Sequence, residues 1–497
     1  MGVFSDAFSW PLIATQISLL LISLILWRRY CSPLSNIPGP VLASFTRLWH
    51  FHRIFVGDQN LQLIRLHDEH GHFVRIAHDE VSVSHPDGIK KLFLSPVPKG
   101  PWYAGLSGSD YRFVAPFNIT NPKAKVELSK AFSPGYTLTN VLQLEGVMNT
   151  TIERLLGWID KYAKTRQPMH LDRFLHYTAF DIVGEVLFST DFGFIREGKD
   201  VDNAIAKSVS LSFFAATSGF YGIWRHAVSN PFMTWLGILP MHHAFMKGVK
   251  AIDERRKNPD GRIDIIAHWF KALETNPDRV TMRNIYAQAG TNVGAGVDTV
   301  ACTLITFMYY MLRHPTALSR VRDEIQAAEK EGLCRTNIVT YADAQRLLYL
   351  QVCIKEALRI FTPVTMGLPR AAPAGGITIG DRTFPEGTIL SISQWVVHLS
   401  TELWGPDARE FNPDRWLRND AAVLEKKYFI PFGAGFESCP GHHVAKMELS
   451  KIIATIVRDY DFRQVDQDQE WQWKAYFTAV PHSWPVNVDK RERPGVD

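Results

Sequence analysis

The sequence has few cysteines, and their positions suit neither disulfide pairing nor a metal cluster. Five are scattered over 497 residues: Cys31, Cys302, Cys334, Cys353 and Cys439. Their odd number and irregular spacing argue against a disulfide framework and against a multi-cysteine metal site. They indicate instead that the chain works in a reducing compartment.

The chain also lacks a strong charge of either sign and any segment typical of a linker. A formal net charge of +4 does not indicate the strongly basic surface that nucleic-acid binding requires. Between residues 37 and 490 there is no long Gly/Ser or Pro run, charge block or internal repeat. Because helical periodicity dominates, we predict one large domain that is mainly α with small β-sheets (α+β).

One long hydrophobic run lies close to the N-terminus. Residues 11–27 are almost uninterruptedly apolar, and Arg28 and Arg29 follow them directly. About 17 residues is the lower limit for a transmembrane helix and suits the thin endoplasmic-reticulum bilayer. The two arginines predict that the main domain faces the cytosol. A cleaved signal peptide would need a basic n-region and a small-residue cleavage site, and both are missing.

The most informative stretch, residues 428–447, surrounds Cys439. It carries the pattern F-x-x-G-x-x-x-C-x-G, with these flanking residues: Phe432, Gly433, Gly435 and Gly441. Apolar residues at helical spacing follow, so the cysteine lies just before a helix N-terminus, where the dipole favours a thiolate. Glycines let the backbone turn close to the sulfur. A lone cysteine is more often a buried hydrophobe, but an anionic one on such a loop can ligate haem iron.

This stretch resembles the cysteine-ligand loop of the cytochrome P-450 superfamily, the haem-thiolate monooxygenases. The resemblance implies that Cys439 binds the iron of haem b and that the flanking phenylalanine and glycines lie against the cofactor. The family usually has a basic residue two positions before the cysteine, which reaches a haem propionate, whereas this chain has Glu437. A carboxylate there should repel propionates. We therefore predict that Glu437 points away or pairs with a cation, and that Glu437→Arg tightens haem retention.

A long helix is predicted from about Met282 to His314. Three glycines in its middle cost roughly 1 kcal/mol each relative to alanine, which favours a functional local opening of the helix over close packing alone. The stretch 295–299 resembles the family's oxygen-binding motif. The resemblance implies that dioxygen is received at Ala295 and Gly296. Thr299 would then hydrogen-bond it while Asp298 helps to relay protons.

Further motifs follow the family's order along the chain. On a predicted helix from Tyr341 to Phe361, Glu356 and Arg359 match the family's E-x-x-R, and Arg415 completes a buried network. Such a network fixes one geometry rather than adding net stability. The resemblance implies that it supports the Cys loop and takes no part in catalysis.

The remaining cofactor contacts and the substrate pocket are implied by the resemblance alone. Lys125, in a predicted helix over residues 121–133, and Arg370 would each meet a haem propionate. Four segments rich in Phe, Trp and Tyr would line a pocket for a lipophilic substrate: residues 102–117, 210–221, 364–368 and 476–479.

Short strands are predicted in two regions. Residues 74–76 and 81–83 alternate like a small hairpin, and residues 377–379 and 388–392 form a second β region. The rest is expected to be mostly helix or loop, with residues 180–188 in a buried core helix.

The predicted organisation has four parts. A short segment (1–10) precedes the transmembrane anchor (11–27). A basic, proline-rich hinge (28–40) leads into one haem-binding catalytic domain (41–497) with the cytochrome P-450 fold. The chain would be a single-pass protein of the endoplasmic-reticulum membrane.

The implied activity is insertion of one oxygen atom from dioxygen into a C–H bond of a lipophilic small molecule. Electrons would come from NADPH through NADPH–cytochrome P-450 reductase, which exposed lysines near the Cys loop could face. The N-terminal half resembles fungal members from natural-product pathways. Three alternatives stay open: a haem-thiolate isomerase or dehydratase, a non-catalytic haem-binding protein, and a cysteine hydrolase using Cys439 with His442 or His443.

Overall fold

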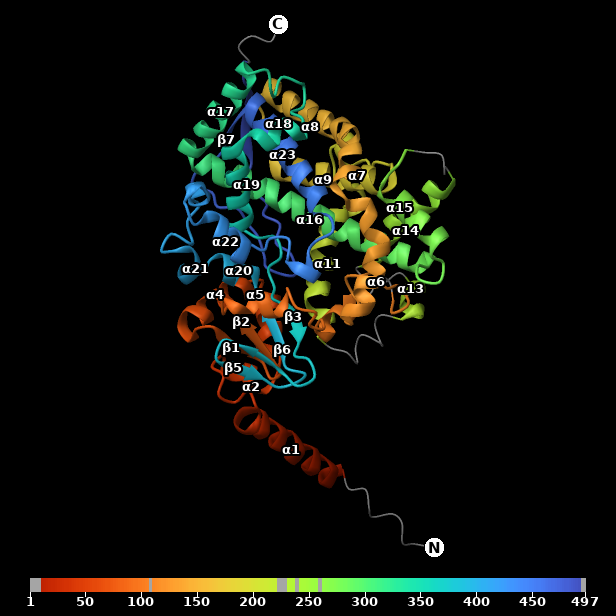
Figure 1. The fold of residues 1–497 in the computed structure, drawn as a ribbon, viewed down its shortest axis with the longest axis vertical. Helices are drawn as coiled ribbons and strands as arrows, with labels where there is room; N and C mark the ends of the chain where they lie inside the picture. The colour runs from red at the N-terminus through yellow and green to blue at the C-terminus, as the bar shows by residue number, and fades with distance from the viewer. Residues whose placement is uncertain (1–9, 107–109, 221–229, 237–240, 258–261, 493–497) are drawn as a thin grey trace.

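Helices dominate the molecule and surround one long central helix, α16 (Figure 1). The computed structural model describes residues 10–106, 110–220, 230–236, 241–257 and 262–492. Strands β1, β2, β3, β5 and β6 lie toward the end of the molecule from which α1 projects, whereas β7 lies toward the opposite end. This architecture confirms the predicted class, mainly α with small β-sheets.

The helical elements have the following bounds: α1 Trp10–Leu26, α2 Val41–Phe45, α3 Leu48–Val56, α4 Gln59–His70, α5 Asp87–Leu92, α6 Pro122–Phe132, α7 Leu138–Gln143, α8 Glu145–Thr165, α9 Leu171–Phe188, α10 Phe194–Glu197, α11 Ala204–Ser218, α13 Pro231–Leu236, α14 Met241–Lys257, α15 Ile265–Thr275, α16 Met282–Arg313, α17 Pro315–Lys330, α18 Tyr341–Arg346, α19 Leu348–Ile360, α20 Gln394–His398, α21 Thr401–Trp404, α22 Ala421–Tyr428 and α23 His442–Asp459. The strands are β1 Phe73–Ala77, β2 Glu80–Val83, β3 Leu368–Ala371, β4 Ile377–Ile379, β5 Arg382–Phe384, β6 Ile389–Ile392, β7 Tyr460–Gln464 and β8 Val486–Lys490.

Helix α16 begins and ends where local chemistry requires. At its start, Thr281 and Asn284 form a capping box, in which each side chain accepts a hydrogen bond from the other's backbone N–H. At its end, His314 is the C-cap and Pro315 opens α17. The predicted range of 282–314 is therefore confirmed to within one residue.

The glycines of α16 serve close packing. A Cβ on Gly296 would lie 3.0 Å from Val183 Cγ2 in α9, and a Cβ on Gly248 of α14 would lie 3.3 Å from the Gly290 nitrogen. The helix is continuous from Met282 to Arg313. The predicted local opening of this helix is therefore wrong, because neighbouring helices use the space that the missing side chains leave.

The predicted helix from Tyr341 to Phe361 is also wrong as a single element. It is two helices, α18 and α19, separated at Leu347, whose ψ of 84° is not helical. The second of these helices carries both E-x-x-R residues. The break therefore does not alter their spacing of three residues.

The main sheet has the strand order β1-β2-β6-β3. The β1–β2 pair is the predicted hairpin, and β6 joins β2 in parallel and β3 in antiparallel register. The antiparallel pairs β4–β5 and β7–β8 are separate. Strand β3 and the β7–β8 pair, which joins Tyr460–Gln464 to Val486–Lys490, lie outside the two predicted β regions, in a remainder that is mostly helix or loop as expected.

The N-terminal apolar run forms helix α1, followed by a short π-helical turn over Trp27–Cys31. The span Leu12–Cys31 is apolar and none of it is buried. Helix α16 is also long and apolar, but 72% of its span is buried, so it is a core helix. The exposed helix fits a single-pass membrane anchor. Residues 1–9 of the predicted N-terminal segment lie outside the described residues.

Candidate functional site

The Cys loop turns tightly just before α23. The Cys439 N–H donates to the Phe432 carbonyl at 2.8 Å, which closes the turn. Gly433 and Gly435 have φ of 69° and 55°, the left-handed region that favours glycine. A Cβ on Gly435 would lie 2.6 Å from the Phe93 carbonyl oxygen. These two glycines are therefore required by backbone geometry, and the loop presents Cys439 three residues before the helix starts at His442.

Cys439 is exposed as a residue, yet its thiol lies in a desolvating environment. Burial raises the pKa of the Cys439 thiol, and a hydrogen bond from the Gly441 N–H opposes that rise. The prediction that a backbone N–H reaches the sulfur is confirmed. That Cys439 is held as an anion stays a prediction. A coordinated cation would remove the proton.

Glu437, the residue that departs from the family pattern, pairs with two lysines. Its carboxylate lies 3.0 Å from Lys99 Nζ and 3.8 Å from Lys125 Nζ. Lys99 is only 4% exposed and also donates to the Phe117 carbonyl at 2.9 Å, while Lys125 donates to the Phe436 carbonyl. Burial lowers the pKa of Lys99 to about 8, and Glu437 opposes that shift. The prediction that Glu437 pairs with a cation is confirmed.

Arg370 is fully buried, and its guanidinium is only partly paired. Its Nη1 donates to Tyr103 Oη at 2.9 Å and to the Pro369 carbonyl at 3.0 Å. Its Nε and Nη2 have no partner among the described residues. Buried N–H groups without a partner are rare because they lose their hydration. This guanidinium therefore has unused capacity to bind an anion.

Lys99, Lys125, Arg370 and Glu437 form one basic cluster. Tyr103 connects them: Lys99 lies over its ring at 4.7 Å, and Arg370 donates to its hydroxyl. Three cations face one carboxylate, which leaves an excess of two positive charges. A site of this kind suits a ligand with two negative charges.

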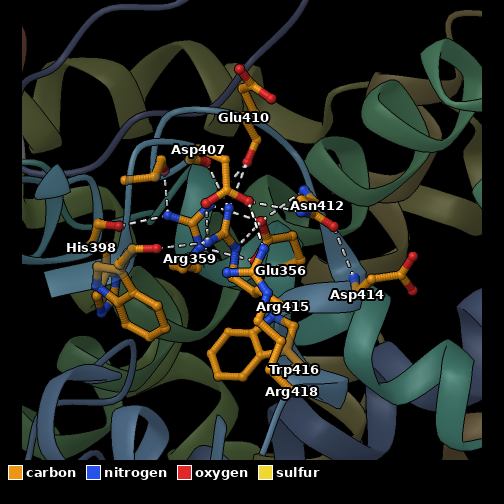
Figure 2. Close-up of polar contacts among 12 residues, drawn as sticks. Glu356, Arg359, His398, Asp407, Glu410, Asn412, Asp414, Arg415, Trp416 and Arg418 are labelled. Atoms are coloured by element: carbon orange, nitrogen blue, oxygen red, sulfur yellow. Dashed lines mark hydrogen bonds and ion pairs between the residues drawn. The ribbon is translucent and has the colours of Figure 1, made fainter. Parts of the chain in front are cut away.

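Behind the loop lies a buried network centred on Glu356 (Figure 2). Its carboxylate accepts from Arg359 at 2.7 and 2.9 Å and from Arg415 at 2.9 Å. The Trp416 indole N–H and the Asn412 backbone N–H each donate to it at 2.9 Å. All three charged side chains are buried. The predicted association of Glu356, Arg359 and Arg415 is thus present, and each of its charges has a charged partner.

His398 connects this network to the Cys loop. Arg359 Nη1 donates to the His398 carbonyl at 2.6 Å, and the Ile430 backbone N–H donates to His398 Nε2 at 3.0 Å. Gln394 Nε2 adds a hydrogen bond of 2.6 Å to the Ile430 carbonyl. Burial, reinforced by Arg359, lowers the pKa of His398 to about 3. The imidazole is therefore neutral and free to accept from the segment that leads to Cys439.

On α16, Asp298 and Thr299 lie in different environments. Ala295 is exposed, and the Thr299 hydroxyl donates to its carbonyl at 2.8 Å. Asp298 is buried, with Oδ1 3.0 Å from His176 Nε2 of α9 and Oδ2 accepting from the Ser208 hydroxyl of α11. The carboxylate thus ties α16 to two other helices instead of facing the same space as Thr299.

The four predicted pocket segments come together in one aromatic cluster. Trp102 Nε1 donates to the Ala215 carbonyl at 3.0 Å, and Ser212 and Thr478 share a hydrogen bond of 3.0 Å. Residues 107–109 and Tyr221 of the predicted segments lie outside the described residues. The cluster contains these residues: Ile54, Trp102, Tyr103, Leu106, Phe117, Phe213, Ala215, Ala216, Phe220, Met366, Tyr476 and Phe477. Trp102 and Tyr103 are almost wholly buried, so part of this cluster is core.

Sequence reasoning missed Lys99, His398, His176 and Ser208. Lys99 lies in the segment Pro98-Lys-Gly-Pro101 and forms a β-bridge with Arg370, and a lysine flanked by prolines was a usable signal. The other three carry no local signal, since their partners lie on distant helices.

Comparison with known proteins identifies the family. Residues 38–480 match the cytochrome P-450 family model, so the chain belongs to this family. It is similar to the cytochrome P-450 monooxygenase cicH of Emericella nidulans, with 29% identity over 92% of this chain and 94% of that protein. It is 30% identical to the cytochrome P-450 monooxygenase asR2 of Sarocladium schorii, over 94% of this chain and 93% of that protein. Pisatin demethylase of Fusarium vanettenii is 28% identical, over 92% of this chain and 90% of that protein.

The family implies haem with a thiolate-ligated iron, and the residues present fit such a group. Cys439 is exposed as a residue, with the Gly441 N–H beside its sulfur. Arg370 has two unpaired N–H groups, and the basic cluster has the positive excess that two propionates require. The fit holds in spite of Glu437, because lysines neutralise its carboxylate.

Proposed function

We propose that this protein is a haem-thiolate monooxygenase that inserts one oxygen atom from dioxygen into a C–H bond of a lipophilic small molecule. The observation that carries the proposal is the Cys439 loop, which presents an exposed cysteine three residues before α23, in a chain that matches the family over residues 38–480. When bound, haem would supply the oxygen-activating chemistry. The protein would supply position, protons and exclusion of water.

Cys439 would ligate the iron, while Phe432, Gly433, Gly435 and Gly441 shape the loop around it. The basic cluster would hold the two propionates. Arg370 would use its unpaired Nε and Nη2, and Lys125 and Lys99 would add two ammonium groups. Arginine suits this role because its planar fork matches a carboxylate.

The network of Glu356, Arg359 and Arg415 would fix the geometry of the Cys loop. It reaches the loop through His398 and the Ile430 backbone, as the hydrogen bonds described above show. Since a fully paired buried network tolerates few alternative arrangements, it would keep the sulfur in one position.

On α16, dioxygen would be received at the exposed Ala295 and the adjoining Gly296, and the Thr299 hydroxyl would donate a hydrogen bond to it. Asp298 would help to relay protons, with His176 Nε2 held 3.0 Å from its Oδ1. The Ser208 hydroxyl would hold the other carboxylate oxygen in place. A positioned acid of this kind is what proton delivery in a water-excluded site requires.

The aromatic cluster favours a lipophilic substrate, and the named relatives favour a fungal secondary metabolite.

Helix α1 would anchor the protein in the endoplasmic-reticulum membrane with the domain in the cytosol. Electrons would come from NADPH through NADPH–cytochrome P-450 reductase. Lys426, Lys427 and Lys446 are exposed beside the Cys loop and would face its acidic surface.

Isotope labelling tests this function. The full-length protein, reconstituted with NADPH and the reductase, is incubated under ¹⁸O₂ with a panel of lipophilic metabolites. We expect a product that contains one ¹⁸O atom and forms only with NADPH. Thr299→Ala should consume NADPH at a similar rate but form less product, because proton delivery is impaired. Turnover without NADPH and without ¹⁸O would identify an isomerase or dehydratase and contradict the proposal.

A further inference from the structure

Glu437 places a carboxylate beside the residue that would ligate the iron. It lies two residues before Cys439, so at most about 7 Å separate the two Cα atoms. The Glu437 backbone N–H donates to the Ala434 carbonyl at 3.0 Å, and its side chain is only 16% exposed. The carboxylate is therefore fixed on the Cys loop instead of turning out into solvent.

A buried ammonium group opposes this charge from another part of the fold. Lys99 Nζ lies 3.0 Å from the Glu437 carboxylate and is almost wholly buried. Lys99 also forms a β-bridge with Arg370, and its Nζ donates to the Phe117 carbonyl at 2.9 Å. The ammonium is thus held as firmly as the carboxylate. The two groups form one ion pair with a fixed orientation.

Lys125 is a less direct partner of the same carboxylate. Its Nζ lies 3.8 Å from Glu437 and donates to the Phe436 carbonyl of the Cys loop. Replacing Lys125 would therefore disturb the loop backbone as well as the charge. The backbone contacts of the Lys99 ammonium go instead to the segment Pro116–Phe117. Lys99 is therefore the residue at which the effect of charge can be separated from the shape of the loop.

Fixed charges close to a haem iron change its reduction potential. Reduction adds one electron to ferric iron and yields ferrous iron, without transfer of any atom. A nearby carboxylate opposes this change because it stabilises the more positive ferric state, whereas an ammonium group favours reduction. Water screens both groups weakly, since both are largely buried. Glu437 therefore has the opposite effect to the basic residue that the family usually has at this position.

We propose that Glu437 and Lys99 form an opposed charge pair that sets the reduction potential of the bound iron, the carboxylate lowering it and the ammonium raising it. The inference rests on the proposed haem-thiolate function. It goes beyond haem retention, because a potential depends on the sign of each charge. The electron would come from the reductase, and the balance of the two charges would decide how favourable that transfer is.

Spectroelectrochemical titration of the full-length, haem-loaded protein measures the potential. Dithionite supplies the electrons through redox dyes at pH 7, where the ammonium of Lys99 is charged because its pKa is about 8. Glu437→Gln should raise the ferrous-to-ferric ratio at a fixed applied potential about tenfold, and tenfold is about 59 mV for one electron. Lys99→Met should lower the ratio by a similar factor. The double variant should lie within about threefold of the wild type, since the two changes oppose each other.

The signs of the two shifts identify their cause. A merely structural role would shift the potential in the same direction in both single variants, because each would loosen the same site. Glu425→Gln is the matched control, since it removes the same group from a half-exposed pair with Lys355 and should change the ratio less than about twofold. If Glu437→Gln fails to retain haem, the double variant should still have a higher potential than Lys99→Met.

The carbon-monoxide difference spectrum of each variant separates this test from that of the proposed function. We expect the same red-shifted Soret band in every variant, because Cys439 is unchanged. Shifts of the same sign in Glu437→Gln and Lys99→Met, or no shift in either, would overturn the charge pair and leave the haem-thiolate function intact. A wild-type protein without that band would overturn both.

Discussion

Two charged assemblies flank the Cys loop, and they are built in opposite ways. In the Glu356 network, one carboxylate meets two guanidinium groups and an indole N–H, and backbone carbonyls take the remaining donors of Arg359. In the basic cluster, two lysines share the single carboxylate of Glu437, and Arg370 adds a third cation that donates to Tyr103 instead. There Arg370 keeps two N–H groups without a partner among the described residues. Both assemblies are largely buried.

The difference separates a structural role from a binding role. A buried charge network that is fully paired holds one geometry, and removing any member leaves another unpaired. A buried cluster with surplus charge and unused donors is costly by itself, so it indicates a ligand of the opposite charge. We therefore propose that the first assembly supports Cys439 and that the second binds the haem propionates.

The largest effect is expected from Glu356→Gln. Buried Arg359 would lose its carboxylate partner and Arg415 would keep only Asp407, 3.2 Å away, at a cost of about 3–5 kcal/mol in the free energy of unfolding. Urea unfolding of the full-length protein in detergent measures this loss. The control is Glu425→Gln, since Glu425 forms a half-exposed ion pair of 2.7 Å with Lys355. That variant should lose less than about 1 kcal/mol. Similar losses in both variants would contradict the account.

Arg370→Met should weaken haem binding without lowering the stability of the haem-free protein. We expect haem to transfer to apomyoglobin at least about tenfold faster, because the propionates lose a bidentate donor. The unfolding free energy of the haem-free protein should change by less than about 1 kcal/mol, since the guanidinium is already underpaired. Arg359→Met is the matched control and should instead destabilise the haem-free protein strongly. An equally large destabilisation by Arg370→Met would remove the distinction between the two assemblies.

Acid should lower the stability of the folded protein through His398, which connects the Glu356 network to the Cys loop. Burial lowers the pKa of His398 to about 3 and that of His67 to about 4, whereas both have a pKa near 6.5 when unfolded. As the pH falls below 6.5, the unfolded chain binds protons that the folded chain does not. Each histidine then costs about 1.4 kcal/mol per pH unit, and this contribution to stability is fully present only above pH 6.5.

Urea unfolding between pH 7.5 and pH 4.5 measures this dependence. His398→Gln should be less stable at pH 7.5 but should lose stability less steeply with acid, because its own contribution is gone while His67 and other histidines whose pKa burial lowers, such as His50, continue to contribute. The reference is His52→Gln, which replaces a histidine outside the network. An unchanged slope in His398→Gln would show that this imidazole is charged in the folded protein.

The smallest effect is expected from Glu437→Arg, which should slow haem loss about threefold because the cluster becomes more positive. The same change should destabilise the haem-free protein, since buried Lys99 loses its partner and faces a like charge. Adding Lys99→Met should restore that stability. Haem transfer and thermal unfolding measure the two effects separately. Faster haem loss in Glu437→Arg would refute the assignment of this carboxylate.

What the sequence predicted well depends on short-range rules. The Cys loop, the E-x-x-R spacing and the ends of α16 each follow from residues a few positions apart, such as Thr281 with Asn284. The helix of α1 follows from an unbroken apolar run. In each case the signal and its cause lie within one element.

What the sequence did not predict depends on contacts between distant segments. Lys99 is paired with Glu437 from the opposite end of the chain, and Asp298 is held by residues of α9 and α11. The break between α18 and α19 at Leu347 contains no glycine or proline that would have predicted it. Strand β7 follows α23 without a turn residue, so helical periodicity concealed it. The thiol pKa of Cys439 depends on desolvation by the whole fold, which no local motif encodes.

The central claim is that Cys439 is the thiolate ligand of a haem iron. The most direct test is the carbon-monoxide difference spectrum of the reduced, membrane-expressed protein, recorded beside Cys439→Ser. We predict a red-shifted Soret band that is absent from the variant. A protein without haem, or a band that persists in Cys439→Ser, would contradict the assignment and the function proposed from it.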